Sequence, residues 1–73
     1  MRVVEITKEP VELYKILKFE GMVGSGGEAK MVIAEGYVTV NGEFETQKRK
    51  KIVSGDIIGF GGETIRILSA EKI

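Results

Sequence analysis

Residues 25–56 read SGGEAKMVIAEGYVTVNGEFETQKRKKIVSGD, and this stretch decides the fold that the sequence predicts. It opens with a helix signal, because Ser25 and Glu28 form a capping box in which the hydroxyl meets the Glu28 amide and the carboxylate reaches back. A hairpin signal follows at Asn41-Gly42, since both residues tolerate positive φ. The stretch then holds four consecutive cations, Lys48, Arg49, Lys50 and Lys51, which we call the basic segment.

Two short helices are predicted before the hairpin. The second covers about residues 26–35 and ends at Gly36, a residue suited to the left-handed conformation that closes a helix. The first covers residues 11–19, with Pro10 suited to its first position and Gly21 as its C-terminal cap. Apolar residues at helical spacing are expected to join the two helices in the core: Leu13, Leu17, Ala29, Val32 and Ile33.

Five short strands complete the predicted fold, at residues 2–6, 37–40, 43–46, 57–60 and 64–68. The order β-α-α-β-β-β-β indicates an α+β domain, with two helices packed on a small, largely antiparallel sheet. A chain of 73 residues is expected to form one domain, which here covers residues 1–73.

The charge distribution is uneven although the net charge is zero, with 11 basic and 11 acidic residues. Residues 46–53 carry the basic segment and no acid, so the rest of the chain carries the balancing negative charge. A neutral chain that gathers its positive charge in one place indicates a surface for a polyanion.

Catalysis has little support in the sequence. The chain has no Cys and no His, which excludes disulfides and Cys/His metal sites, and no cofactor is expected. The glycines around Ser25 lack the G-x-x-x-x-G-K-[ST] pattern of a phosphate loop. Glu43 and Glu45 share one face of a strand, but charged residues on an exposed edge explain them more simply than a catalytic pair. We therefore expect no enzymatic activity.

The sequence also bears on location. No apolar run approaches the roughly 20 residues that span a bilayer. The first residues are too few and too charged for a signal peptide. We therefore expect a cytoplasmic monomer without membrane association.

The ordered features are similar to a known family. Two helices, the G-x-V-x-V-N-G stretch at residues 36–42, the basic segment and Gly55-Asp56 together resemble the S-four RNA-binding domain, whose helices form the αL motif. The match runs from Leu13 to Ile58 without insertions and includes Leu13, Leu17, Gly21, Ser25, Ala29 and Ile33. S-G-G-E-A-K at residues 25–30 and the basic stretch at 45–51 are similar to short stand-alone bacterial members. Two arginines usual in the family are replaced here, by Glu12 and Gly26.

This resemblance implies a module that binds structured RNA, such as ribosomal RNA or transfer RNA, and that associates with ribosomal particles. The basic segment and Lys30 are the expected phosphate contacts. At Gly26 and Gly27, which lack side chains, an RNA backbone can approach the positive end of the second helix. Further candidates are Lys15, Lys18 and Asn41, although the lysines also fit a solvated helix face and Asn41 serves the turn first. Tyr37 could stack on a base, and packing is its alternative role.

Two other functions stay open. A protein-interaction adaptor would use the same basic patch to hold an acidic partner, and an appendage would serve an enzyme encoded separately. RNA binding predicts steep salt dependence and competition by bulk RNA. An adaptor predicts a stoichiometric protein partner that survives nuclease.

Overall fold

The computed structural model describes residues 1–70, which form seven strands and two helices. In chain order these are β1 (Arg2–Ile6), β2 (Val11–Glu12), α1 (Leu13–Phe19), α2 (Gly26–Ala34), β3 (Thr39–Val40), β4 (Glu43–Phe44), β5 (Lys51–Ile52), β6 (Ile57–Phe60) and β7 (Glu63–Ser69).

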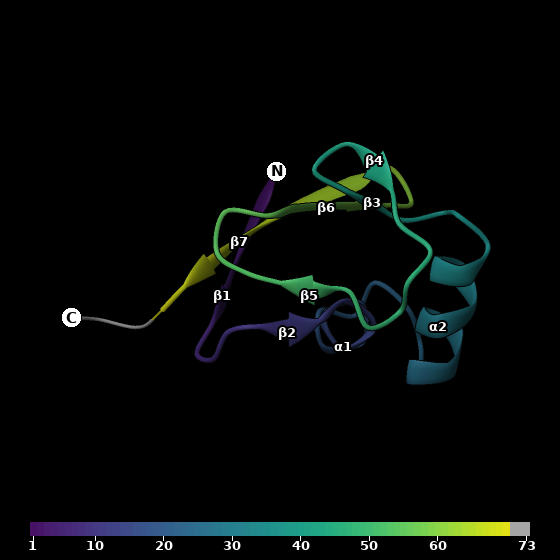
Figure 1. Ribbon diagram of the computed structural model, residues 1–73, viewed down its shortest axis with the longest axis horizontal. Helices are drawn as coiled ribbons and strands as arrows, with labels where there is room; N and C mark the ends of the chain where they lie inside the picture. The colour runs from purple at the N-terminus through teal and green to yellow at the C-terminus, as the bar shows by residue number, and fades with distance from the viewer. Residues whose placement is uncertain (71–73) are drawn as a thin grey trace.

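Five of the strands form the main sheet, in the order β1-β7-β6-β3-β4. Only β1 and β7 run parallel, with Val4 opposite Ile67, and the other pairs are antiparallel. These strands and the two helices follow the predicted order, so the α+β class with a largely antiparallel sheet is confirmed. In Figure 1, β3, β4 and β6 lie at the top of the view and β1 and β7 run down from them toward the lower left, with α1 below the sheet and α2 to one side.

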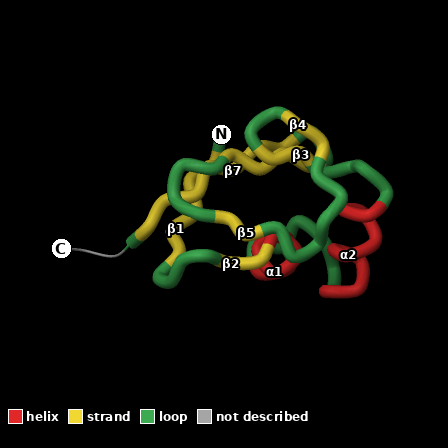
Figure 2. The backbone as a smooth tube through the Cα atoms, in the orientation of Figure 1, coloured by secondary structure: helices red, strands yellow, loops and turns green. Residues whose placement is uncertain are grey.

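A second, two-stranded sheet was not predicted. It pairs β2 with β5, so that Val11 lies opposite Ile52 and Glu12 opposite Lys51. Figure 2 shows the two strands side by side next to α1. Each strand has only two residues, too few to leave a periodic pattern in the sequence.

The core lies between the helices and one face of the main sheet. Alternation along the strands brings Val4 and Ile6 of β1 and Ile65 and Ile67 of β7 to this face. The helix residues that join the core are those expected from the helical spacing: Leu13, Leu17, Ala29, Val32 and Ile33. All five are buried, and four of them have no exposed surface.

Helix α1 begins at Leu13, so its predicted start near Pro10 is wrong. Val11 and Glu12 are extended instead, because they pair with β5. Glu12 stands at the N-cap but makes no side-chain capping bond. The free amides of the first turn donate to carbonyl oxygens from a distant part of the chain, as described below. A cap made of remote backbone has no local sequence signature.

The other ends of the helices agree closely with the sequence. Gly21 and Gly36 have φ of +72° and +83°, and each follows the C-cap residue of its helix. Their amides, and those of the next residues, bond carbonyl oxygens of the last turn, as in a Schellman motif. Helix α2 ends at Ala34, one residue earlier than predicted, because Glu35 is its C-cap.

The predicted capping box is only half formed. The Ser25 hydroxyl accepts from the Glu28 amide at 3.1 Å, as expected. The Glu28 carboxylate accepts from the amide of Gly24 at 2.7 Å and makes no bond to the Ser25 amide. The carboxylate therefore bonds the residue before the N-cap, Gly24, whose amide the bend into α2 brings within hydrogen-bond distance.

The hairpin forms where it was predicted. Asn41 and Gly42 have φ of +54° and +87°, the positive values that a tight hairpin turn requires. Strands β3 and β4 are shorter than expected, at two residues each. The pairing nevertheless continues beyond them, since the Glu45 amide donates to the Val38 carbonyl at 2.9 Å.

Candidate nucleic-acid interface

The basic segment is held in place by backbone hydrogen bonds to α1. The amides of Leu13 and Tyr14, in the first turn of α1, donate to the carbonyl oxygens of Lys50 at 3.0 Å and Lys48 at 3.1 Å. Lys51 itself belongs to β5. The segment therefore caps α1, and its own conformation is fixed in return.

The side chains of the basic segment take no part in these bonds. All four are exposed. A bond from the Lys50 amide to the Gln47 carbonyl at 3.1 Å closes the turn at residues 47–50, which contains three of the four cations. Just before this turn, the Gln47 amide donates to the Glu45 carboxylate at 3.0 Å. The structure thus places four cations on an anchored backbone without using their charges for stability.

These four cations line two different grooves. Lys48 and Arg49 line a shallow groove with Lys30 of α2, and the other residues of its wall are neutral: Ala34, Thr46 and Gln47. We call this the cationic groove. Figure 1 shows why it forms, since the segment that leads from β4 to β5 passes beside α2. Three predicted contacts from two parts of the chain therefore meet in one groove that has no acid in its wall.

Lys50 and Lys51 lie in the other groove, beside the β3–β4 hairpin. Three carboxylates share the wall of this hairpin groove: Glu43, Glu45 and Asp56. Its remaining lining residues are Val40, Asn41, Phe44 and Val53. The local charge is negative by one, so this groove attracts an anion less than the cationic groove does.

The first-helix lysines also occupy different surroundings. Lys15 lies 3.6 Å from the Glu12 carboxylate, a surface ion pair that partly compensates its charge. Lys18 extends toward the start of α2, where a Cβ added to Gly26 would lie 3.8 Å from its Cδ. Gly27 is exposed beside it. The structure thus brings Lys18 together with the two glycines that were predicted to admit an RNA backbone.

Tyr14 is a residue of this surface that the sequence reasoning missed. Lys30 Nζ lies 4.9 Å from the centre of the Tyr14 ring, within the range of a cation–π contact. Tyr14 is half-buried and packs against the core. The available signal was an aromatic residue among lysines on one helix, because Tyr14 precedes Lys15 and stands one turn before Lys18.

Both polar atoms of the Asn41 side chain form hydrogen bonds within the protein. Its side-chain oxygen accepts from the Ile57 amide at 2.9 Å, and its side-chain nitrogen donates to Asp56 at 3.0 Å. The other Asp56 oxygen accepts from the Val53 amide at 3.0 Å, so the same carboxylate also holds the Gly55-Asp56 turn. A contact between Asn41 and RNA stays a prediction.

The alternative roles of Tyr37 can also be compared with the structure. Tyr37 is 61% exposed, which does not agree with a packing role.

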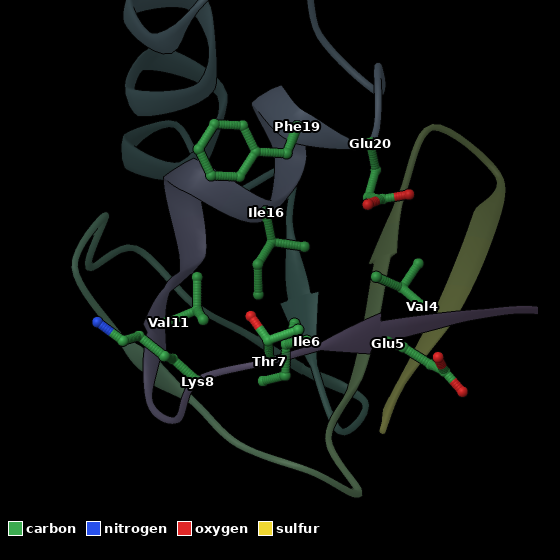
Figure 3. A pocket seen from close by; sticks show the side chains of 9 residues that line it. All are labelled: Val4, Glu5, Ile6, Thr7, Lys8, Val11, Ile16, Phe19 and Glu20. Atoms are coloured by element: carbon green, nitrogen blue, oxygen red, sulfur yellow. The ribbon is translucent and has the colours of Figure 1, made fainter. Parts of the chain in front are cut away.

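An apolar hollow between β1 and α1, shown in Figure 3, is formed by Val4, Ile6, Val11, Ile16 and Phe19, with polar residues on its rim. Lys8 is its one cation, so it does not belong to the cationic groove.

Among residues 1–70, no three acidic, Cys or His side chains are gathered in a way that could hold a metal ion. Neither helix in this range has the length and apolar character that crossing a membrane requires.

The comparisons with known proteins decide the family. The model of the S4 domain matches residues 4–68, nearly the whole chain. The chain belongs to the S4 domain family. The resemblance drawn from the ordered motifs is therefore confirmed.

Relatives of this S4 domain have the same small size. The chain is 44% identical over 70 residues to "Putative RNA-binding protein YbcJ" of Escherichia coli (strain K12), covering 94% of this chain and 100% of the relative. It is 34% identical over 61 residues to "Probable ribosome maturation protein RlbA" of Bacillus subtilis (strain 168), covering 80% and 86%. These names describe RNA-binding and ribosome maturation, not enzymes, in agreement with the expected non-catalytic class.

A solved structure supports the same fold. The solution structure of YbcJ from Escherichia coli, described as having an αL motif involved in RNA-binding, is similar with a TM-score of 0.71 and 43% identity. The match covers 93% of this chain and 87% of the other. The two S4 domain helices, α1 and α2, are thus confirmed as the αL motif predicted from the sequence.

Proposed function

We propose that this protein is a non-catalytic module that binds structured RNA, such as ribosomal RNA or transfer RNA, mainly through phosphate contacts. The observation that carries the proposal is the cationic groove. Lys30, Lys48 and Arg49 line it without a compensating acid, and the backbone on either side of Arg49, at Lys48 and Lys50, is bonded to α1. An anchored backbone does not have to be ordered when a phosphate binds, which favours affinity.

The geometry favours recognition of shape and phosphate spacing over a base code. The contacts proposed are cations and exposed backbone at the start of α2, and neither distinguishes one base from another. Arg49 can make a bidentate phosphate contact, whereas the lysines act as point charges. The remaining proposed contacts are Lys50, Lys51, Lys15, Lys18, Gly26, Gly27 and Asn41.

The names of the relatives support a ribosome-related role. YbcJ is named for RNA binding and RlbA for ribosome maturation, so we propose ribosomal particles or their precursors as the setting. This role would place the protein in the cytoplasm as a monomer, acting as one domain over residues 1–73.

Direct binding measurements test the proposal. The purified protein is titrated with a folded ribosomal RNA fragment, a transfer RNA and an uncharged polymer of similar size, without metal beyond that needed to fold the RNA. We expect binding of the two RNAs at about 50 mM salt and a steep loss as the salt concentration rises. Equal, negligible binding of RNA and of the uncharged polymer would overturn the proposal.

A four-fold variant links this binding to the basic segment. Replacing Lys48, Arg49, Lys50 and Lys51 together by Gln should reduce the log–log salt slope by about 1.4–2.7 units, which is two to three phosphate contacts at about 0.7–0.9 each. Unfolding should change little, because the segment is anchored by its backbone and its side chains are exposed. A folded variant with an unchanged slope would favour the adaptor instead, and a nuclease-resistant protein partner would then be expected.

A further inference from the structure

The side chain and backbone of Tyr14 contact basic residues from three parts of the chain. Lys30 Nζ of α2 lies 4.9 Å from the ring centre, and Lys15 Nζ of α1 lies at 6.0 Å. The Tyr14 amide donates to the carbonyl oxygen of Lys48 at 3.1 Å. Packing against the core holds the ring in place between these elements.

The kind of contact matters for a phosphate-binding surface. A carboxylate that held Lys30 would also neutralise it, as Glu12 partly does for Lys15 at 3.6 Å. An aromatic ring has no net charge, so it can orient an ammonium group and leave its charge available to an anion. In the described residues, no carboxylate lies within ion-pair distance of Lys30.

The position of Lys30 has a further consequence. It is the α2 cation of the cationic groove, which Lys48 and Arg49 also line. A free lysine side chain samples many rotamers, and fixing it on binding reduces affinity. A ring that already restrains Lys30 beside the groove lowers this cost.

We propose that Tyr14 is a positioning residue of the RNA-binding surface, which holds Lys30 over its ring in the orientation that meets a phosphate. Tyr14 acts through Lys30 and need not touch the RNA. This inference rests on the proposed RNA-binding function.

A double-mutant cycle between Tyr14 and Lys30 tests it by RNA affinity. Tyr14→Leu removes the ring and should weaken binding about two- to five-fold, because Lys30 then has to be restrained when the phosphate binds, and the strength of one exposed cation–π contact limits this cost. Lys30→Ala should weaken binding about five- to eight-fold at 0.1 M salt, as expected for one phosphate contact. In the Lys30→Ala background, Tyr14→Leu should have less than about a two-fold effect. Equal effects of Tyr14→Leu with and without Lys30 would overturn the inference.

Two controls separate positioning from folding. Tyr14→Phe keeps the ring and should retain wild-type affinity, so it remains informative if Tyr14→Leu unfolds. Loss of binding by a folded Tyr14→Phe variant would instead mean that the hydroxyl contacts RNA, against the proposal. Lys18 lies over the ring of Phe19 at 5.9 Å. A Tyr14–Lys18 cycle should therefore be additive to within about two-fold.

An RNA-free measurement distinguishes the two proposals. Protons near Lys30 Nζ should show a ring-current shift in the NMR spectrum of the wild-type protein that disappears in Tyr14→Leu and persists in Tyr14→Phe. If the shift is absent, or if it is present and the affinity cycle is additive, the positioning role is wrong while RNA binding stands. If the wild-type protein binds no RNA, both proposals fall together.

Discussion

The division of the basic segment between two grooves leads to a test with equal charge changes. Lys48→Gln/Arg49→Gln and Lys50→Gln/Lys51→Gln each remove two positive charges from neighbouring positions of one segment. Any effect of net charge alone is therefore the same for both variants. A difference between them reports where the cations point and which groups surround them.

The expected change in salt slope follows from the residues that line the two grooves. Lys48 and Arg49 share the cationic groove with Lys30 and with no acid, whereas Lys50 and Lys51 share the hairpin groove with three carboxylates. Loss of two phosphate contacts should lower the salt slope by about 1.4–1.8, which is about 25- to 60-fold in affinity at 0.1 M relative to 1 M salt. For Lys50→Gln/Lys51→Gln we expect less than one contact, a slope change below about 0.7.

The assay is a filter-binding or fluorescence titration with one folded RNA at four or more salt concentrations. Thermal unfolding of both variants serves as a check that the segment still caps α1. Equal slope changes in the two variants would refute the reasoning from the groove walls. A larger change for Lys50→Gln/Lys51→Gln would move the binding surface to the hairpin groove.

Three predictions concern the fold. Ile33→Ala should lower the free energy of unfolding by about 2–5 kcal/mol in chemical denaturation, because Ile33 is fully buried between the helices; a loss below about 0.5 kcal/mol would contradict this packing. Asn41→Ala should lower the free energy of unfolding by about 1–3 kcal/mol, since it removes two side-chain hydrogen bonds and a residue that tolerates positive φ. The RNA affinity of the folded variant will show whether Asn41 also binds RNA. Gly59→Ala should cost about 1–3 kcal/mol, because the new Cβ would lie 2.6 Å from Thr39 Oγ1; unchanged stability would mean that the sheet relaxes freely there.

Much of the scaffold was determined by the sequence alone. Gly21 and Gly36 mark the ends of the helices, and Asn41-Gly42 marks the hairpin, because these backbone positions require positive φ and few residues tolerate it. The buried faces of the helices followed from spacing, since apolar residues three and four apart share one side of a helix. These signals act over a few residues, so they can be read without the fold.

Only the tertiary structure decided how the candidate site is arranged. Helix α1 starts at Leu13 because backbone carbonyls of Lys48 and Lys50, more than thirty residues away, satisfy its first amides. The four adjacent cations of the basic segment lie in two different grooves. Lys48 and Arg49 share one groove with Lys30, whereas Lys50 and Lys51 share the other with three carboxylates. The contact between Tyr14 and Lys30 likewise depends on how α1 packs against α2. These backbone bonds and grooves involve residues that are far apart in the chain. A local sequence pattern therefore does not predict which of them come into contact.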